Sequence, residues 1–128
     1  MIVVATDAPL SPRDLSRLAA RAIFGLARTG SSYSNGSGDF AIAFSTAKAL
    51  RVAHGSRALT PRPTLLPEAV SPLFEAVLEA TEEAVLNSLL RAEAMTGNGR
   101  AVPALDVEKV RELLKKYGRS TGISPAPR

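Results

Sequence analysis

The stretch that decides the fold lies near the amino end and reads Ile2-Val3-Val4-Ala5-Thr6-Asp7-Ala8-Pro9-Leu10-Ser11-Pro12. Its first five residues form a continuous, largely β-branched run, which is typical of a strand covered on both faces. The next four residues, Asp7-Ala8-Pro9-Leu10, predict a turn. Ser11-Pro12 then predicts the start of a helix, with Ser11 as N-cap and proline at the first helical position.

Apolar side chains predict how far this helix extends. They recur every three or four residues to about residue 27, and Gly30 is expected to end the helix. The inward side chains are Leu15, Leu18, Ala19, Ala22, Ile23 and Leu26. After a polar loop over residues 29–38, Phe40-Ala41-Ile42-Ala43-Phe44 alternates large and small apolar residues. This alternation predicts a second strand whose bulky side chains face a core.

The second half of the chain predicts two helices after a connecting loop over residues 48–67. A long helix begins at about Ser71 and is expected to end at Gly97 and Gly99. Its apolar stripe comprises Leu73, Phe74, Val77, Leu78, Thr81, Val85, Ser88, Leu89 and Ala92. Asp106 is expected to cap a short helix that ends at Gly118, and its inward side chains would be Val107, Val110, Leu113 and Leu114. Residues 119–128 are expected to form a flexible tail.

This order predicts an α+β chain with two strands, too few to close a barrel or a sandwich. Two strands and three helices can cover the first strand only incompletely. We therefore expect an exposed apolar surface that binds a partner protein or a second copy of the chain.

Composition excludes several classes of chemistry. The chain has 128 residues, no Cys and one His. Thiol catalysis, cysteine-ligated metals and multi-histidine metal sites are therefore excluded, and a Ser/His/Asp triad would depend on His54 alone. No carboxylate lies near His54 in the sequence, so a solvated histidine is the better interpretation. No apolar run reaches the length of a membrane span and no signal peptide is evident, so we expect a soluble, cytoplasmic protein without a membrane partner.

Basic residues exceed acidic ones, giving a net charge of +4. Arg13, Arg17 and Arg21 would form a row along one face of the first helix and could bind phosphates. Aromatic stacking residues and recognition motifs are missing around them. A solvated or subunit-facing helix face is therefore favoured over a nucleic-acid-binding module.

Ser37-Gly38-Asp39 is the candidate site that residue chemistry favours most. A hydroxyl and a carboxylate would lie on the same side of an extended segment, separated by a residue without a side chain. The alternative is that Asn35-Gly36-Ser37-Gly38-Asp39 simply forms a turn that leads into a strand, because these residue types favour turns. Thr6-Asp7, at the carboxyl end of the first strand, could form the edge of a second site. An Asp before a helix, however, usually accepts hydrogen bonds from backbone amides.

Several strings, in order and at compatible spacing, resemble the carboxyl-terminal β-subunit of the self-processing L-aminopeptidase/D-esterase family, which includes the β-aminopeptidases. They are Val-Val-Ala-Thr-Asp-Ala-Pro-Leu (3–10), Leu-Ala-Arg-Thr-Gly-Ser (26–31), Asn-Gly-Ser-Gly-Asp (35–39), Ala-Phe-Ser-Thr-Ala (43–47), Leu-Phe-Glu-Ala-Val (73–77), Ala-Thr-Glu-Glu-Ala (80–84) and Ala-Glu-Ala-Met-Thr-Gly (92–97). The resemblance extends from Met1 to about residue 119.

The resemblance implies a four-layer αββα sandwich to which residues 1–118 supply two core strands and covering helices. It also implies a precursor that cleaves itself into an α-chain and this β-chain, exposing a serine whose α-amine serves as the base. Ser37 and Asp39 would orient and polarise that serine. Small peptides, amides or esters would be hydrolysed through an acyl-enzyme, without metal or organic cofactor, by αβ units that assemble further.

The first residues depart from the family pattern. The nucleophilic serine should lie one or two residues upstream of Met1, and the oxyanion donors are expected from the α-chain. We therefore expect this chain to be inactive alone, and its substrate-binding residues stay unassigned. The alternative is a non-catalytic remnant or packing subunit that keeps the fold without the chemistry.

Overall fold

The computed structural model describes residues 1–118 and divides into two compact units, Met1–Leu86 and Asn87–Arg128. The predicted tail, residues 119–128, lies outside the described residues.

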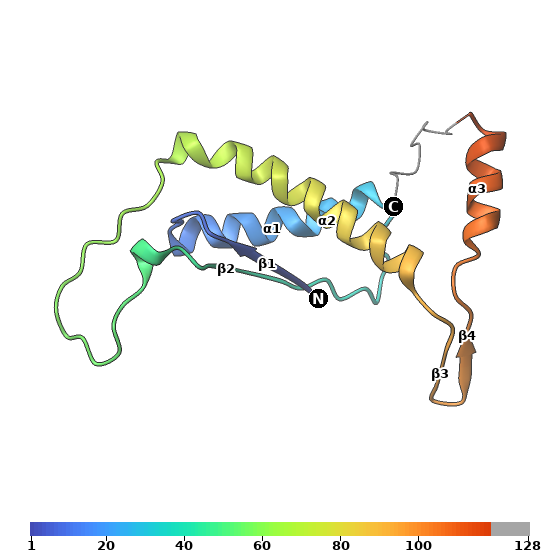
Figure 1. Cartoon of the computed structure of the whole chain (residues 1–128), viewed down its shortest axis with the longest axis horizontal. Helices are drawn as coiled ribbons and strands as arrows, with labels where there is room; N and C mark the ends of the chain where they lie inside the picture. The colour runs from blue at the N-terminus through green and yellow to red at the C-terminus, as the bar shows by residue number, and fades with distance from the viewer. Residues whose placement is uncertain (119–128) are drawn as a thin grey trace, which may run out of the picture. The chain divides into compact units, whose positions relative to one another are not determined.

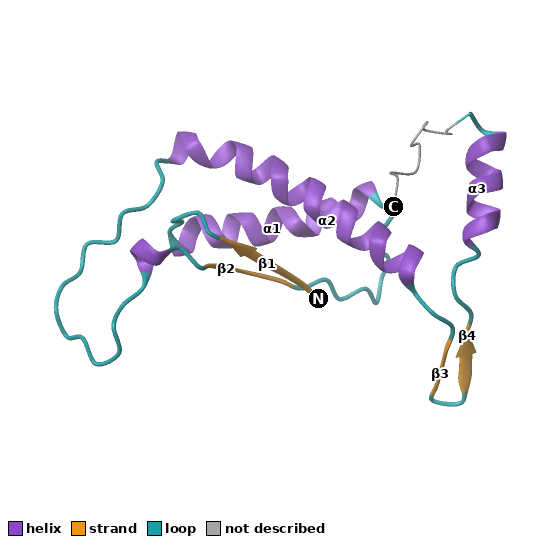
Figure 2. Ribbon diagram, in the orientation of Figure 1, coloured by secondary structure: helices purple, strands orange, loops and turns teal. Residues whose placement is uncertain are grey.

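The first unit is built on a strand-helix-strand arrangement (Figures 1 and 2). Strand β1 (Ile2–Thr6) leads through α1 (Pro12–Arg28) to β2 (Ala41–Ser45). The two strands pair in parallel, with Ile2 opposite Ala41 and Thr6 opposite Ser45. Short 3-10 turns at Lys48–Leu50 and Pro67–Val70 bracket the connecting loop, and α2 (Ser71–Arg91) follows.

Helix α1 begins and ends where the sequence predicts. Ser11 is the N-cap, and its Oγ accepts a hydrogen bond from the Asp14 N–H at 3.2 Å. The Ser11 hydroxyl donates in return to Asp14 Oδ2 at 2.6 Å, so the two residues form a reciprocal cap. Beyond the last residue, Gly30 has a φ of 92°, a conformation that glycine adopts at little cost.

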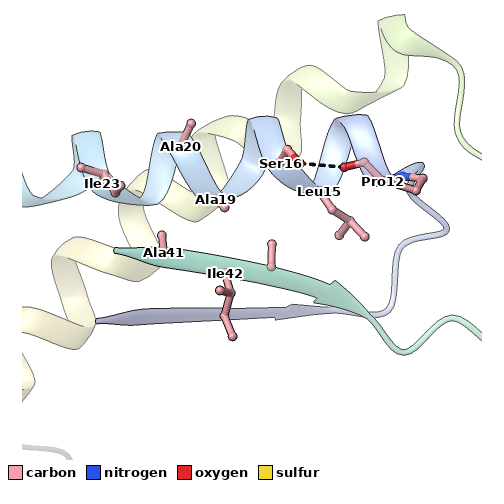
Figure 3. A pocket seen from close by; sticks show the side chains of 9 residues that line it. Pro12, Leu15, Ser16, Ala19, Ala20, Ile23, Ala41 and Ile42 are labelled. Carbon is pink, nitrogen blue, oxygen red and sulfur yellow. Dashed lines mark hydrogen bonds between the residues drawn. The ribbon is translucent and has the colours of Figure 1, made fainter. Parts of the chain in front are cut away.

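The two faces of the β1–β2 sheet differ from the prediction. Val3 and Ile42 are 58% and 54% exposed, so in this chain β1 is covered on one face only. The small side chains of β2 face α1, as Figure 3 shows for Ala41, whereas Ile42 points away from the helix. Because α1 packs closely over small residues, the bulky residues of β2 take the open face, and the expectation that they face this chain's core is wrong.

The core lies between the sheet, α1 and the first half of α2. Its buried members are Leu10, Leu18, Ala22, Val70 and Val77. The helices approach closely at Gly25, where a Cβ atom would lie 2.8 Å from the Cβ of Thr81. The inward stripe of α2 is confirmed as far as Thr81, but Leu89, which was also expected to face inward, is 49% exposed.

The second unit contains a hairpin that the sequence reading missed. Strands β3 (Met95–Gly97) and β4 (Arg100–Val102) pair in antiparallel fashion, and α3 (Val107–Lys116) follows. Gly97 and Gly99 therefore do not end α2, which stops at Arg91. Asp106 caps α3 as predicted, its carboxylate accepting from the Lys109 N–H at 3.0 Å. No residue of α3 is buried, so the expectation of an inward face is not met within this unit.

Candidate active site

Ser37 and Asp39 lie in direct contact at the end of the loop that joins α1 to β2. The Ser37 hydroxyl donates a hydrogen bond to Asp39 Oδ2 at 2.8 Å. Ser37 is exposed and Asp39 is half-buried, so both remain within reach of other groups. Because the Ser37 proton is held by the carboxylate, the lone pairs of its oxygen are available to accept a further hydrogen bond.

Two glycines shape the backbone on either side of Ser37. Gly36 has a φ of 93° in a turn closed by the Ser37 N–H, which donates to the Ser34 carbonyl at 2.9 Å. At Gly38 a Cβ atom would lie 3.3 Å from Cε2 of Phe40, which is tighter than an ordinary contact. The turn that the sequence predicts is therefore present, with the hydroxyl–carboxylate pair beside it, and the catalytic role of this pair stays a prediction.

The serine–aspartate pair lies at the amino end of the parallel strands. The Ile2 N–H donates to the Phe40 carbonyl at 2.8 Å, which extends the pairing one step beyond β2. Parallel strands keep a constant register. A residue placed two or three positions before Ile2, which is one or two positions before Met1, would thus lie beside Asp39 and Gly38.

Thr6-Asp7 and His54 lie away from this pair. Thr6 ends β1 and Asp7 follows it, about 13 Å and 16 Å along the chain from Ile2 at the amino end of this five-residue strand. There Thr6 Oγ1 accepts from the Ala8 N–H at 3.1 Å, a structural role. His54 sits in an exposed turn beyond the carboxyl end of β2. The structure thus gives no support to a triad built on His54.

The arginine row of α1 is largely engaged in packing. Arg21 lies 3.6 Å and Arg17 4.8 Å from the centroid of the Phe74 ring in α2. Arg17 also contacts Asp14 at 3.0 Å. Two of the three side chains therefore join α1 to α2, which favours the helix-face interpretation over a nucleic-acid interface.

Other hollows and clusters do not compete with the Ser37–Asp39 pair. An open groove of about 550 Å³ lies between α1 and β2 (Figure 3). Its lining is Pro12, Leu15, Ser16, Ala19, Ala20, Ile23, Ala41, Ile42 and Ala43, without a titratable side chain. Residues 1–118 hold no cluster of three or more potential metal ligands. Within the same residues no helix has the length and apolar character needed to span a membrane.

Solved structures define the class of protein. The PH0078 protein of Pyrococcus horikoshii OT3 is 47% identical, with a TM-score of 0.83 over 91% of this chain and 33% of its own. The L-aminopeptidase D-Ala-esterase/amidase of Ochrobactrum anthropi, described as a prototype serine aminopeptidase and a variant of the Ntn hydrolase fold, is 40% identical, with a TM-score of 0.83 over 94% of this chain and 34% of its own. A Burkholderia sp. β-aminopeptidase is 36% identical, with a TM-score of 0.77 over 91% of this chain and 35% of its own. The chain therefore has the fold of about one third of an Ntn hydrolase, which confirms the expected mixed α and β class.

Sequence relatives define the family. The profile of peptidase family S58 matches residues 1–102, and the chain belongs to this family. β-Peptidyl aminopeptidase BapA of Sphingosinicella microcystinivorans is 43% identical over 120 residues, which are 93% of this chain and 30% of that protein. BapA of Sphingosinicella xenopeptidilytica is 43% identical over 101 residues, 79% of this chain and 25% of its own length. The chain thus spans less than one third of these relatives, and the recognised resemblance is confirmed.

Sequence reasoning missed one residue of the loop. Tyr33 has a φ of 49°, and its hydroxyl donates to the carbonyl of Ile23 in α1. The sequence shows only a tyrosine among serines, because the contact joins residues ten positions apart.

Proposed function

We propose that this chain is the β-subunit part of a self-processing serine aminopeptidase, in which Ser37 and Asp39 orient a serine nucleophile that precedes Ile2. Residues 1–118 are assigned to this β-subunit. The reaction class is acyl transfer to serine, and the substrates are small peptides, amides or esters with a free amino end.

One observation carries the proposal. The hydrogen bond from the Ile2 N–H to the Phe40 carbonyl, at 2.8 Å, fixes the register of the strands at their amino ends. This register directs the segment before Ile2 to the hydrogen-bonded pair of Ser37 and Asp39. The amino end of β1, to which the proposed nucleophile would be attached, therefore lies at the same end of the sheet as Ser37 and Asp39, and this supports the proposal without a role for His54.

The chemistry follows from the charges at this place. A free α-amine has a pKa of about 8, so near neutral pH a useful fraction is unprotonated and accepts the proton of the serine hydroxyl as its oxygen attacks the acyl carbonyl. Ser37 Oγ accepts a hydrogen bond from this amino end, and the Asp39 carboxylate stabilises the ammonium that forms. The ammonium then protonates the leaving amine. Water subsequently releases the acyl group and regenerates the serine.

The proposed partner is an α-chain that arises from the same precursor by self-cleavage. The open apolar face of the β1–β2 sheet supports a second protein layer there, because single chains seldom leave such a face in water. The α-chain would also supply oxyanion donors, so the β-chain is proposed to be inactive alone. Assembly of αβ units and a cytoplasmic location are part of the same proposal.

The test uses a restored precursor, in which an α-like portion is followed by the nucleophilic serine and then by one or two further residues before Ile2. It is taken from the upstream reading frame or, where that frame is closed, from BapA of S. microcystinivorans. Ser37→Ala and Asp39→Asn should each lower processing or turnover by at least about tenfold at unchanged melting temperature. Ser32→Ala and Asp7→Asn, two exposed sites, serve as matched controls. Unchanged rates in both site variants would show that Ser37-Gly38-Asp39 only forms a turn and takes no part in catalysis.

The reading frame upstream of the Met1 codon discriminates the enzyme from a non-catalytic remnant. A serine codon shortly before Ile2 and a long α-like region favour the enzyme. A stop codon at that place favours the packing subunit.

A further inference from the structure

Tyr33 has a backbone conformation that tyrosine rarely adopts. Its φ of 49° lies in the left-handed region, which is favourable for glycine and tolerated by asparagine. Such conformations persist in folded proteins where surrounding contacts hold them, and they cluster at functional sites. The contacts of the Tyr33 side chain therefore need an explanation.

The Tyr33 hydroxyl ties the loop to α1. It donates a hydrogen bond to the carbonyl of Ile23, ten residues earlier in the chain. Residues 31–38 are all exposed, so apolar burial contributes little to the position of this segment. Its position relative to α1 must then depend on hydrogen bonds, of which the Tyr33 bond reaches farthest back into the helix.

The same bond is not needed to end α1. The Thr29 N–H donates to the Leu26 carbonyl at 3.0 Å, and the Gly30 N–H donates to the Ala27 carbonyl at 3.2 Å. These two bonds satisfy carbonyls of the last turn without help from Tyr33. The hydroxyl of Tyr33 therefore acts on the loop that follows the helix rather than on the helix end.

We propose that Tyr33 is a positioning residue for the Ser37–Asp39 pair, an inference that rests on the proposed function of that pair. From Tyr33 the chain enters the turn closed by Ser34 and Ser37, and Ser37 then contacts Asp39. One end of this path is held on α1 by Tyr33. The other is held on β1 by the bond between Phe40 and Ile2. Loss of the first anchor would let the hydroxyl–carboxylate pair move relative to the nucleophile.

The first test measures loop order in the 128-residue chain itself. Tyr33→Phe removes only the hydroxyl, and Tyr117→Phe makes the same change at an exposed tyrosine of the other unit. Hydrogen exchange at the Ser37 amide should become at least about threefold faster in Tyr33→Phe and stay unchanged in Tyr117→Phe. Amides of α1 report whether the fold is intact. Unchanged exchange at Ser37 would overturn the proposal.

The second test separates positioning from general stability. In the restored precursor, Tyr33→Phe should lower kcat by about threefold to tenfold, with KM within twofold and an unchanged melting temperature. If Ser37→Ala is impaired and Tyr33→Phe retains full kcat, the positioning role is wrong while the proposed function stands. If Ser37→Ala leaves kcat unchanged, the proposed function is wrong. The hydrogen-exchange measurement then still decides whether Tyr33 holds the loop in place.

Discussion

At the scale of the residue, Asp14 is a titratable group whose environment is altered by folding. Its carboxylate accepts from the Ser11 hydroxyl at 2.6 Å and from Arg17 at 3.0 Å. The hydrogen bond from Ser11, the larger of these two effects, lowers the pKa of Asp14 below its ordinary value of 3.8. The folded state thus favours the ionised carboxylate, so its stabilisation is fully present above about pH 4 and is lost as the pH falls through the lowered pKa.

Asp14→Asn should therefore lower the melting temperature at pH 7, and the difference from wild type should shrink steadily below pH 4. Thermal melts between pH 2 and pH 8 check this, with Asp7→Asn as an exposed control. A difference that stays constant over the whole range would show that the cap does not depend on charge.

Residue-scale prediction succeeded for a contact that follows from local sequence, whereas the catalytic role of the two residues stays a prediction. Ser37 and Asp39 are two positions apart, so chain geometry alone suggests their contact, and the observed bond of 2.8 Å agrees with it. The contact of Tyr33 was not predicted, because its partner, the carbonyl of Ile23, lies ten residues away in the sequence. The backbone conformation at Tyr33 also has no signal in residue type.

At the scale of the element, the crossing of α1 and α2 depends on Gly25. A Cβ atom there would meet Thr81 Cβ at 2.8 Å and the Leu78 carbonyl at 3.2 Å. Gly25→Ala would gain about 1 kcal/mol in helix propensity, but overpacking against backbone costs roughly 1–3 kcal/mol, so net destabilisation is expected. Urea unfolding measures the change, and an unaltered or raised midpoint would contradict the close approach.

Element prediction was reliable for capped, amphipathic helices and failed at the hairpin. Asn98 and Gly99 have φ values of 48° and 71°, the conformation that a two-residue hairpin turn requires. Asn-Gly between two short extended segments was an available signal. The apolar stripe of the sequence instead continues to Ala92 and predicts a helix that ends at Gly97 and Gly99, whereas α2 stops at Arg91.

At the scale of the whole molecule, the chain leaves apolar surface without cover. The exposed side of the first sheet carries Val3, Phe40, Ile42 and Phe44, exposed by 45% to 66%. The sequence predicted incomplete cover from the small number of elements. It did not reveal which face stays open, because strand alternation does not state on which side the helices pack.

Replacing Ile42 tests whether this face drives association. Burying a side chain of this size contributes about 1.5–3 kcal/mol, so the open face should make the isolated chain self-associate at micromolar concentration. Ile42→Lys places a charge at the centre of the face and should lower both the mass measured by light scattering and the binding of an apolar dye. Leu59→Lys makes a matched change at a fully exposed loop position and should leave both unchanged. A wild-type chain that stays monodisperse and monomeric, with the same dye binding as Ile42→Lys, would mean that the sheet needs no partner, and the β-subunit assignment would lose its structural support.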